Sequence, residues 1–141
     1  MSRMPNLQEI NERGSRYLPG HLGVLFTQLS EAEVRSELSV RQSLMAPNGY
    51  LHAGTVVSLA DTSAGYGCIA NLPPGAVGFT TIELKANYLG TARDGTIECV
   101  ARPVHLGKTT QVWDAVVTHR ELGKTIALFR CTQLLLYAKA P

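Results

Sequence analysis

Alternating apolar and polar positions dominate the second half of the chain, and this period of two is typical of strands with one buried face. Four alternating stretches there are predicted strands: 78–89, 96–105, 109–119 and 124–137. Two shorter stretches before them, 22–29 and 33–41, predict a hairpin with a tight connection at 30–32. Turn residues at 106–108 and 121–123 separate the last three strands, which we therefore expect to be antiparallel.

One long stretch, 52–71, has the helical period instead. Small and apolar residues share one face of it with Asp61: Val57, Ala60, Ala64 and Cys68. Its Gly, Ala and Ser content lowers intrinsic helix propensity, so packing around this helix must hold it. A short polar helix is expected over 6–17, ending near 19–20. We therefore predict one α+β domain over 1–141, with a helical extension at 1–20 and about six antiparallel strands wrapped around one long central helix.

Turn residues indicate where the loops lie. The run 47–49, Pro-Asn-Gly, predicts a loop just before the long helix. Asp94-Gly95 predicts a hairpin turn, because this pair accepts the positive φ that such turns require. Pro103 cannot donate a hydrogen bond to a neighbouring strand, so we expect it at a sheet edge or a bulge.

Composition and charge narrow the class of protein. Of the 141 residues, 45% are hydrophobic and 17% are charged, which is typical of a folded globular protein. The net charge of +2 comes from scattered Lys and Arg, which argues against a nucleic-acid partner. No apolar stretch reaches the roughly 18–20 residues that a membrane span needs. Residues 1–10 lack the apolar core of a signal peptide, so a cytoplasmic location is the default expectation.

Cysteine and histidine spacing predicts neither a disulfide framework nor a metal site. The three cysteines, Cys68, Cys99 and Cys131, are far apart and form no Cys-x-x-Cys pair. We expect them to be reduced and packed as small apolar residues. The four histidines have no spacing that would bring two ligands together, so we expect no metal.

Asp61 is the most unusual residue of the predicted helix, because no other acidic, basic or histidine residue occurs between 53 and 82. Burial penalises the charged form of a carboxyl group, and a core helix keeps such a residue when it has a task. The task that we infer is hydrolysis of an acyl thioester, with Asp61 as general base or nucleophile. Alternatively, Asp61 caps a helix that starts at Asp-Thr-Ser, with 56–59 as a strand.

Thioester hydrolysis also needs hydrogen-bond donors for the oxyanion that forms. The free backbone N–H groups at the start of the helix, at Ala53 and Gly54, meet this need, and Gly54 lets a substrate come close. Asp61 lies eight residues beyond Ala53, which is about 12 Å along a helix axis. One carbonyl group cannot contact both, so joint participation requires a dimer in which each site takes residues from two subunits.

Two segments resemble hotdog-fold acyl-CoA thioesterases of the phenylacetate-pathway and 4-hydroxybenzoyl-CoA type. Asn48-Gly-Tyr-Leu-His52-Ala-Gly54, followed by Leu59-Ala-Asp61, resembles the loop and central helix of that group. The run 102–113 is similar to the same group, including its dihydroxynaphthoyl-CoA members. The resemblance covers about 38–137 and implies a hotdog fold, in which the antiparallel sheet wraps around the central helix.

The resemblance implies roles for single residues. Asp61 matches the catalytic carboxylate, Ala53 the residue whose N–H polarises the thioester carbonyl, and His52 the residue before it. Asn48 resembles a polar loop residue near the water or carbonyl, and Thr81 a hydroxyl that helps to place water. Five residues resemble those that meet the nucleotide end of coenzyme A in this group: Arg93, Arg102, Lys108, Thr109 and Thr110. Their basic and hydroxyl side chains suit the phosphates of coenzyme A.

The chain departs from the pattern of this group at two positions. The commonest motif is His-Gly-Gly, whereas this chain has Ala53, whose methyl group narrows the approach to its N–H. Members with Glu at the acid position often carry Thr or Ser one turn later, where this chain has Gly65. We therefore expect Thr81 or Ser63, rather than a residue at position 65, to supply a hydroxyl group to the site.

Each of these residues also has a purely structural reading. His52 can make one hydrogen bond in its loop, Asn48 can form the turn, and Thr81 can be an ordinary strand residue. The basic turn residues can be solvated charges. Three aromatic residues can pack in the core or line an acyl pocket: Tyr66, Tyr88 and Trp113.

We expect an acyl-CoA thioesterase for a small aromatic or medium-chain acyl group, with coenzyme A as part of the substrate and no separate cofactor. A hydratase or dehydratase of the same fold is an alternative, although His-Phe-Pro-Gly does not occur. A non-catalytic acyl-CoA-binding module is another. The expected assembly is a homodimer with shared sites, and apolar positions such as Leu134 and Leu136 favour a dimer of dimers, a homotetramer.

Overall fold

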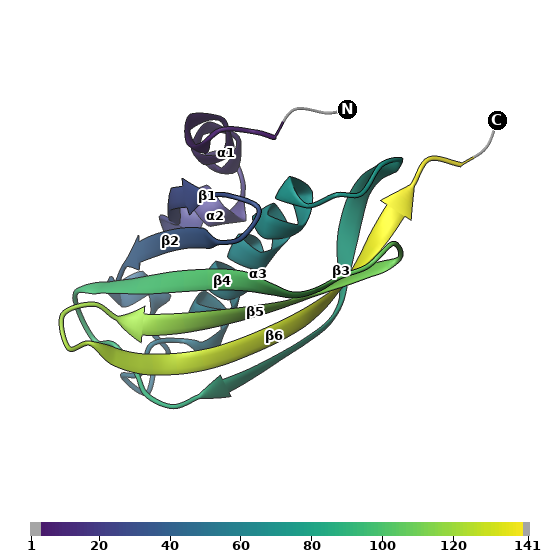
Figure 1. Cartoon of the computed structure of the whole chain (residues 1–141). Coiled ribbons are helices and arrows are strands. Elements are labelled where there is room, and N and C mark those ends of the chain that lie inside the picture. Colours follow the sequence, from purple (N-terminus) through teal and green to yellow (C-terminus); the bar gives the residue numbers. More distant parts are fainter. Residues whose placement is uncertain (1–3, 140–141) are drawn as a thin grey trace.

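One antiparallel sheet wraps around a single long helix, which confirms the predicted α+β class (Figure 1). This computed structural model describes residues 4–139. Residues 1–3 of the predicted extension and 140–141 of the predicted domain lie outside the described residues. The elements in chain order are α1 Leu7–Gly14, α2 Leu18–Leu22, β1 Leu25–Leu29, β2 Val34–Ser39, η1 Gln42–Leu44, α3 Ala53–Ala70, β3 Ala76–Tyr88, β4 Thr96–Leu106, β5 Thr110–His119 and β6 Lys124–Tyr137.

Helix α3 occupies the concave side of the sheet and supplies much of the core (Figure 1). Its small residues allow close packing, as predicted. A Cβ atom at Gly67 would lie 2.4 Å from the ring of Trp113, so only glycine fits beneath this fully buried indole. Leu59 and Cys68 are fully buried on the same helix. Tertiary packing therefore holds a helix that its composition alone would leave marginal.

The six strands follow the order β1-β2-β4-β5-β6-β3, and every neighbouring pair is antiparallel. Strand β3 therefore forms one edge, where it pairs only with β6. The prediction for Pro103 is confirmed in both respects. The pairing of β4 with β2 ends at Ala101, and the register between β4 and β5 shifts after Pro103.

The connection from β3 to β4 differs from the prediction. Gly95 does have a positive φ, of 74°, as Asp-Gly implies. However, β3 and β4 are not neighbours in the sheet, so Arg93-Asp94-Gly95 is not a hairpin turn. It belongs to a loop that crosses from the edge strand to the interior strand β4. Turn chemistry reports local backbone angles, whereas the pairing partner is decided by distant strands.

The N-terminal elements also correct the prediction of one helix over 6–17. Asn6 caps α1 by accepting a hydrogen bond from the Glu9 N–H (2.9 Å), but the helix ends at Gly14. A second helix, α2, then includes Pro19 near its first turn, where proline is tolerated. The strand predicted over 22–29 consequently starts at Leu25. The hairpin of β1 and β2 is confirmed.

The three cysteines are buried and free, as expected. Burial raises the pKa of each thiol to about 12, so these groups stay protonated. Within residues 4–139, no helix is both long enough and apolar enough to span a membrane.

Candidate active site

Asp61 lies in the middle of α3, on the side that meets the edge strand β3. The Thr81 hydroxyl of β3 donates a hydrogen bond to Asp61 Oδ1 over 3.1 Å. Burial raises the pKa of the Asp61 carboxyl, and the hydrogen bond from Thr81 offsets part of that rise. The structural alternative, in which Asp61 caps a helix, is wrong because eight residues of α3 precede it. A partly buried acid with raised pKa is suited to taking a proton from water.

Gln133 of β6 extends this contact into the core. Its Oε1 lies 2.7 Å from Thr81 Oγ1, and the residue is fully buried. A threonine hydroxyl has one proton, so it cannot donate to both neighbours. With Asp61 ionised, Thr81 donates to the carboxylate and the Gln133 amide must turn its NH₂ toward Thr81. Sequence reasoning missed Gln133, although a glutamine between the inward-facing Cys131 and Leu135 was a signal.

The start of α3 carries the second candidate group. His52 is the N-cap, and its Nδ1 accepts a hydrogen bond from the Gly54 N–H over 2.8 Å. The N–H groups of Thr55 and Val56 bond to the His52 carbonyl. Among the described residues, the Ala53 N–H has no hydrogen-bond partner, and Ala53 is exposed. This N–H is therefore a free donor at the positive end of the helix dipole.

A surface cavity of about 430 Å³ opens beside Ala53 and is lined also by Asn48, His52 and Tyr88. The Asn48 side chain is engaged in the turn, where its Oδ1 accepts a hydrogen bond from the Tyr50 N–H (3.1 Å). The Tyr88 hydroxyl donates to the Ala53 carbonyl over 3.2 Å. The structure thus places three predicted site residues, Asn48, His52 and Ala53, around one opening.

Asp61 is not part of this opening. Two turns of α3 separate it from Ala53, about 12 Å along the axis. One protomer therefore has a carboxylate with its hydroxyl partner at one place and a free N–H donor at another. Either half alone lacks a group that hydrolysis needs.

The predicted coenzyme A residues do not form one cluster within a protomer. Arg93 precedes β4 and stacks on Tyr50, with its Cζ 4.9 Å from the ring centroid. Lys108, Thr109 and Thr110 follow β4, whose eleven residues span about 35 Å. These groups lie at opposite ends of the sheet, because strand direction separates turns that look alike in sequence (Figure 1).

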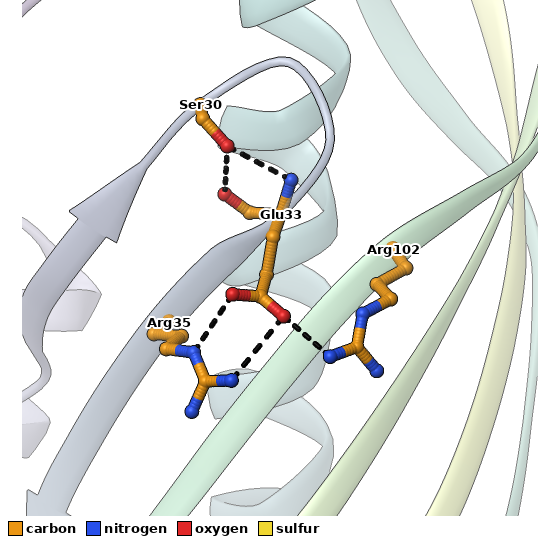
Figure 2. Close-up of polar contacts among 4 residues, drawn as sticks. All are labelled: Ser30, Glu33, Arg35 and Arg102. Atoms are coloured by element: carbon orange, nitrogen blue, oxygen red, sulfur yellow. Dashed lines mark hydrogen bonds and ion pairs between the residues drawn. The ribbon is translucent and has the colours of Figure 1, made fainter.

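Arg102 is engaged elsewhere, as Figure 2 shows. Its guanidinium pairs with Glu33, which also accepts a hydrogen bond from Arg35 Nε over 2.8 Å. Arg35 first, and then Arg102, hold the pKa of the Glu33 carboxyl below its usual range. This ion-pair triad joins β2 to β4 and leaves Arg102 with a structural partner.

The contacts of the remaining candidate residues show which of them lie beside Asp61. The Ser63 hydroxyl bonds to Ser36 (2.6 Å) and to the Leu59 carbonyl, and Ser63 is fully buried away from Asp61. Thr81 is therefore the hydroxyl that the fold brings to Asp61. Tyr66 packs edge-on against Phe26, with ring centroids 4.9 Å apart. No group of three potential metal ligands occurs within the part of the chain that is described.

Comparison with known proteins gives a consistent result. Residues 48–126 match the thioesterase superfamily. The 1,4-dihydroxy-2-naphthoyl-CoA hydrolase of Listeria monocytogenes is 32% identical over 111 residues, which are 79% of this chain and 89% of that protein. The hydrolase of the same name from Escherichia coli is 29% identical and covers 95% of this chain and 97% of its own length. A crystal structure of a mutant of thioesterase PA1618 from Pseudomonas aeruginosa superposes with a TM-score of 0.89, at 27% identity, covering 96% of this chain and 97% of the other.

Proposed function

Since the chain belongs to the thioesterase superfamily and is a thioester hydrolase, we propose that it hydrolyses the thioester of a small acyl-CoA, with an aromatic or medium-chain acyl group. The observation that carries the proposal is the carboxylate of Asp61, which is partly buried beside the Thr81 hydroxyl. The relatives named as hydrolases of an aromatic acyl-CoA support this substrate class. Coenzyme A enters as part of the substrate.

In the proposed reaction, the Ala53 N–H donates a hydrogen bond to the thioester oxygen and polarises the carbonyl. Asp61 either takes a proton from a water molecule, which attacks the carbonyl carbon, or attacks that carbon itself. When the tetrahedral intermediate collapses, the C–S bond breaks and coenzyme A leaves as a thiolate that takes up a proton. On the route in which Asp61 attacks, the acyl group remains on its carboxylate as an anhydride, which water then hydrolyses to the free acid. His52 holds the loop around Ala53 by accepting the Gly54 N–H, and Gly54 leaves room for the substrate.

Each complete site needs a second copy of the chain. The edge strand β3 has thirteen residues, and one of its sides pairs with no strand of the described chain. Leu84 lies opposite the buried Cys131, on the side of the sheet that faces α3, yet is 44% exposed, and Tyr88 is 46% exposed. Long apolar edges are normally covered. Antiparallel pairing of two β3 strands would cover both edges and bring each α3 start toward the middle of its partner.

Two further parts of the proposal concern assembly and the nucleotide. Apolar residues on the outer face of β5 and β6, Val116, Leu128 and Leu134, remain partly exposed and favour pairing of dimers into a tetramer. Arg93 and the segment 108–110 come from opposite ends of the sheet, so we propose that they meet coenzyme A from different subunits. Arg102 acts there only if it leaves Glu33.

The test is hydrolysis of a panel of acyl-CoAs, with the released thiol detected by a colorimetric reagent. We expect turnover of benzoyl- and octanoyl-CoA, and a loss of about 10²–10⁴-fold in kcat for Asp61→Asn, as for removal of an acid–base group. Asp114→Asn is the matched control, because Asp114 pairs with Arg130 at the surface. Binding without turnover would support a non-catalytic module instead, and water addition to an enoyl-CoA a hydratase.

A further inference from the structure

The contact line between α3 and β3 continues past Asp61 toward the end of the helix. Asp61, Gly65 and Ile69 follow one another at four-residue intervals, so they lie on one side of α3. Thr81 and Phe79 are two residues apart on β3 and face that side. Thr81 contacts Asp61, and Phe79 contacts Gly65 one helical turn further on. Phe79 is therefore the next side chain of β3 that an acyl group would meet beyond the carboxylate.

A cavity of about 600 Å³ lies on the far side of Phe79. Its apolar lining comes from three elements: Ile10 of α1, Ile69 of α3, Leu72 after α3, and Val77 and Phe79 of β3. The charged residues Glu9 and Arg13 of α1 line it as well. Neither Asp61 nor Thr81 borders it. The Phe79 ring thus stands between the carboxylate and a partly apolar space large enough for a drug-sized ligand.

Gly65 explains why the ring lies there. A Cβ atom built on Gly65 would be 2.9 Å from Phe79 Cζ, closer than a carbon contact allows. Any side chain at this helix position would push the ring away from α3. The glycine thus lets the ring close the passage along the helix.

We propose that Phe79 is a specificity-determining residue that limits the length of the acyl group. This inference rests on the proposed function, because it takes Asp61 as the point of attack. The ring forms the end wall of the acyl site, where a planar aromatic acyl group stacks and a long chain is stopped. The cavity beyond the ring is closed to substrate in the wild-type chain and becomes accessible once the ring is removed.

The test is the chain-length profile of Phe79→Ala, measured as kcat/KM for butanoyl-, octanoyl-, dodecanoyl- and hexadecanoyl-CoA and for benzoyl-CoA. We expect the ratio of dodecanoyl- to butanoyl-CoA to rise at least about 10-fold, and benzoyl-CoA to lose activity. Phe79→Leu, which keeps an apolar side chain, should shift the profile less. An unchanged profile in both variants would overturn the proposal.

Val77→Ala is the matched control, because Val77 lines the same cavity but lies beyond the ring. It should leave the chain-length profile unchanged, and an equal shift in this variant would contradict a role specific to Phe79. The contact between Gly65 and Phe79 is tested by the thermal stability of variants. Gly65→Ala should lower the Tm of the wild-type chain, and the loss should be smaller in the Phe79→Ala background.

A binding measurement distinguishes failure of the proposed function from failure of the inference about Phe79. If the wild-type chain hydrolyses none of the acyl-CoAs, the thioesterase proposal fails, whatever Phe79 does. Calorimetric titration with dodecanoic acid then still tests whether the Phe79 ring closes the end of the acyl site. Binding to Phe79→Ala but not to the wild-type chain supports it, and equal binding to both overturns it.

Discussion

At the scale of single residues, the proposed reaction and the burial of Asp61 favour opposite protonation states of its carboxyl group. In the proposed reaction the Asp61 carboxyl must be ionised, whereas burial in α3 disfavours the charged form and raises its pKa above the ordinary value of 3.8. The charged carboxylate therefore lowers the stability of the fold at pH values above that raised pKa. Thr81 moderates this conflict, because its hydrogen bond favours ionisation. Gln133 in turn fixes the Thr81 hydroxyl from the core.

The pH dependence of activity follows from these contacts. The proposed reaction requires ionised Asp61, so we expect kcat/KM to fall as pH decreases through the pKa of Asp61. Thr81→Val removes the hydrogen bond that lowers this pKa, and the acidic limb of the profile should move to higher pH. Thr80→Val is the control, since Thr80 faces the other side of β3. A limb that stays in place or moves to lower pH would show that Thr81 does not act through Asp61.

At the scale of elements, α3 depends on residues that lack side chains. Gly67 lies under Trp113, and Gly65 lies under Phe79. The sequence predicts α3 well, because its period and its ends are local properties. The limits of β4, β5 and β6 are also predicted to within one residue. The separation of α1 from α2 is not predicted. Hydrogen bonds between Asn11 and the Phe26 backbone hold α1 to β1, and such a contact between distant residues is invisible to local patterns.

The packing at Gly67 predicts a large effect of a single methyl group. Gly67→Ala would place Cβ 2.4 Å from the Trp113 ring, so the helix or the indole must move. We expect a loss of about 1–3 kcal/mol in the free energy of unfolding, measured by urea denaturation. Gly78→Ala is the control, because no atom lies within 4 Å of a Cβ built there. Equal stability of the two variants would refute this account of the core.

At the scale of the whole molecule, the fold separates groups that the sequence placed together. The helix motif correctly predicts that Asp61 and Ala53 lie about 12 Å apart along one helix. The sequence does not show that Arg93 and Lys108 lie at opposite sheet ends, because that depends on strand order. The crossing loop at Asp94-Gly95 was mistaken for a hairpin for the same reason. Pairing between strands far apart in the chain is the information that local patterns lack.

Sharing of the site between subunits is tested by complementation. Ala53→Pro removes the proposed N–H donor, and proline is well accepted at the first position of a helix. Ala53→Pro and Asp61→Asn homodimers should each be inactive. Mixed dimers, formed by co-expression, contain one intact site and should regain part of the activity. No recovery in purified mixed dimers would show that both groups act within one protomer.

The pairing of β3 with β6 also bears on how the chain is made. Strand β3 leaves the ribosome well before β6, its partner within the sheet and the last of the six strands in chain order. Until then its apolar side chains have no cover, and the sheet cannot close around α3. Folding of the sheet is therefore completed only after β6 has been synthesised.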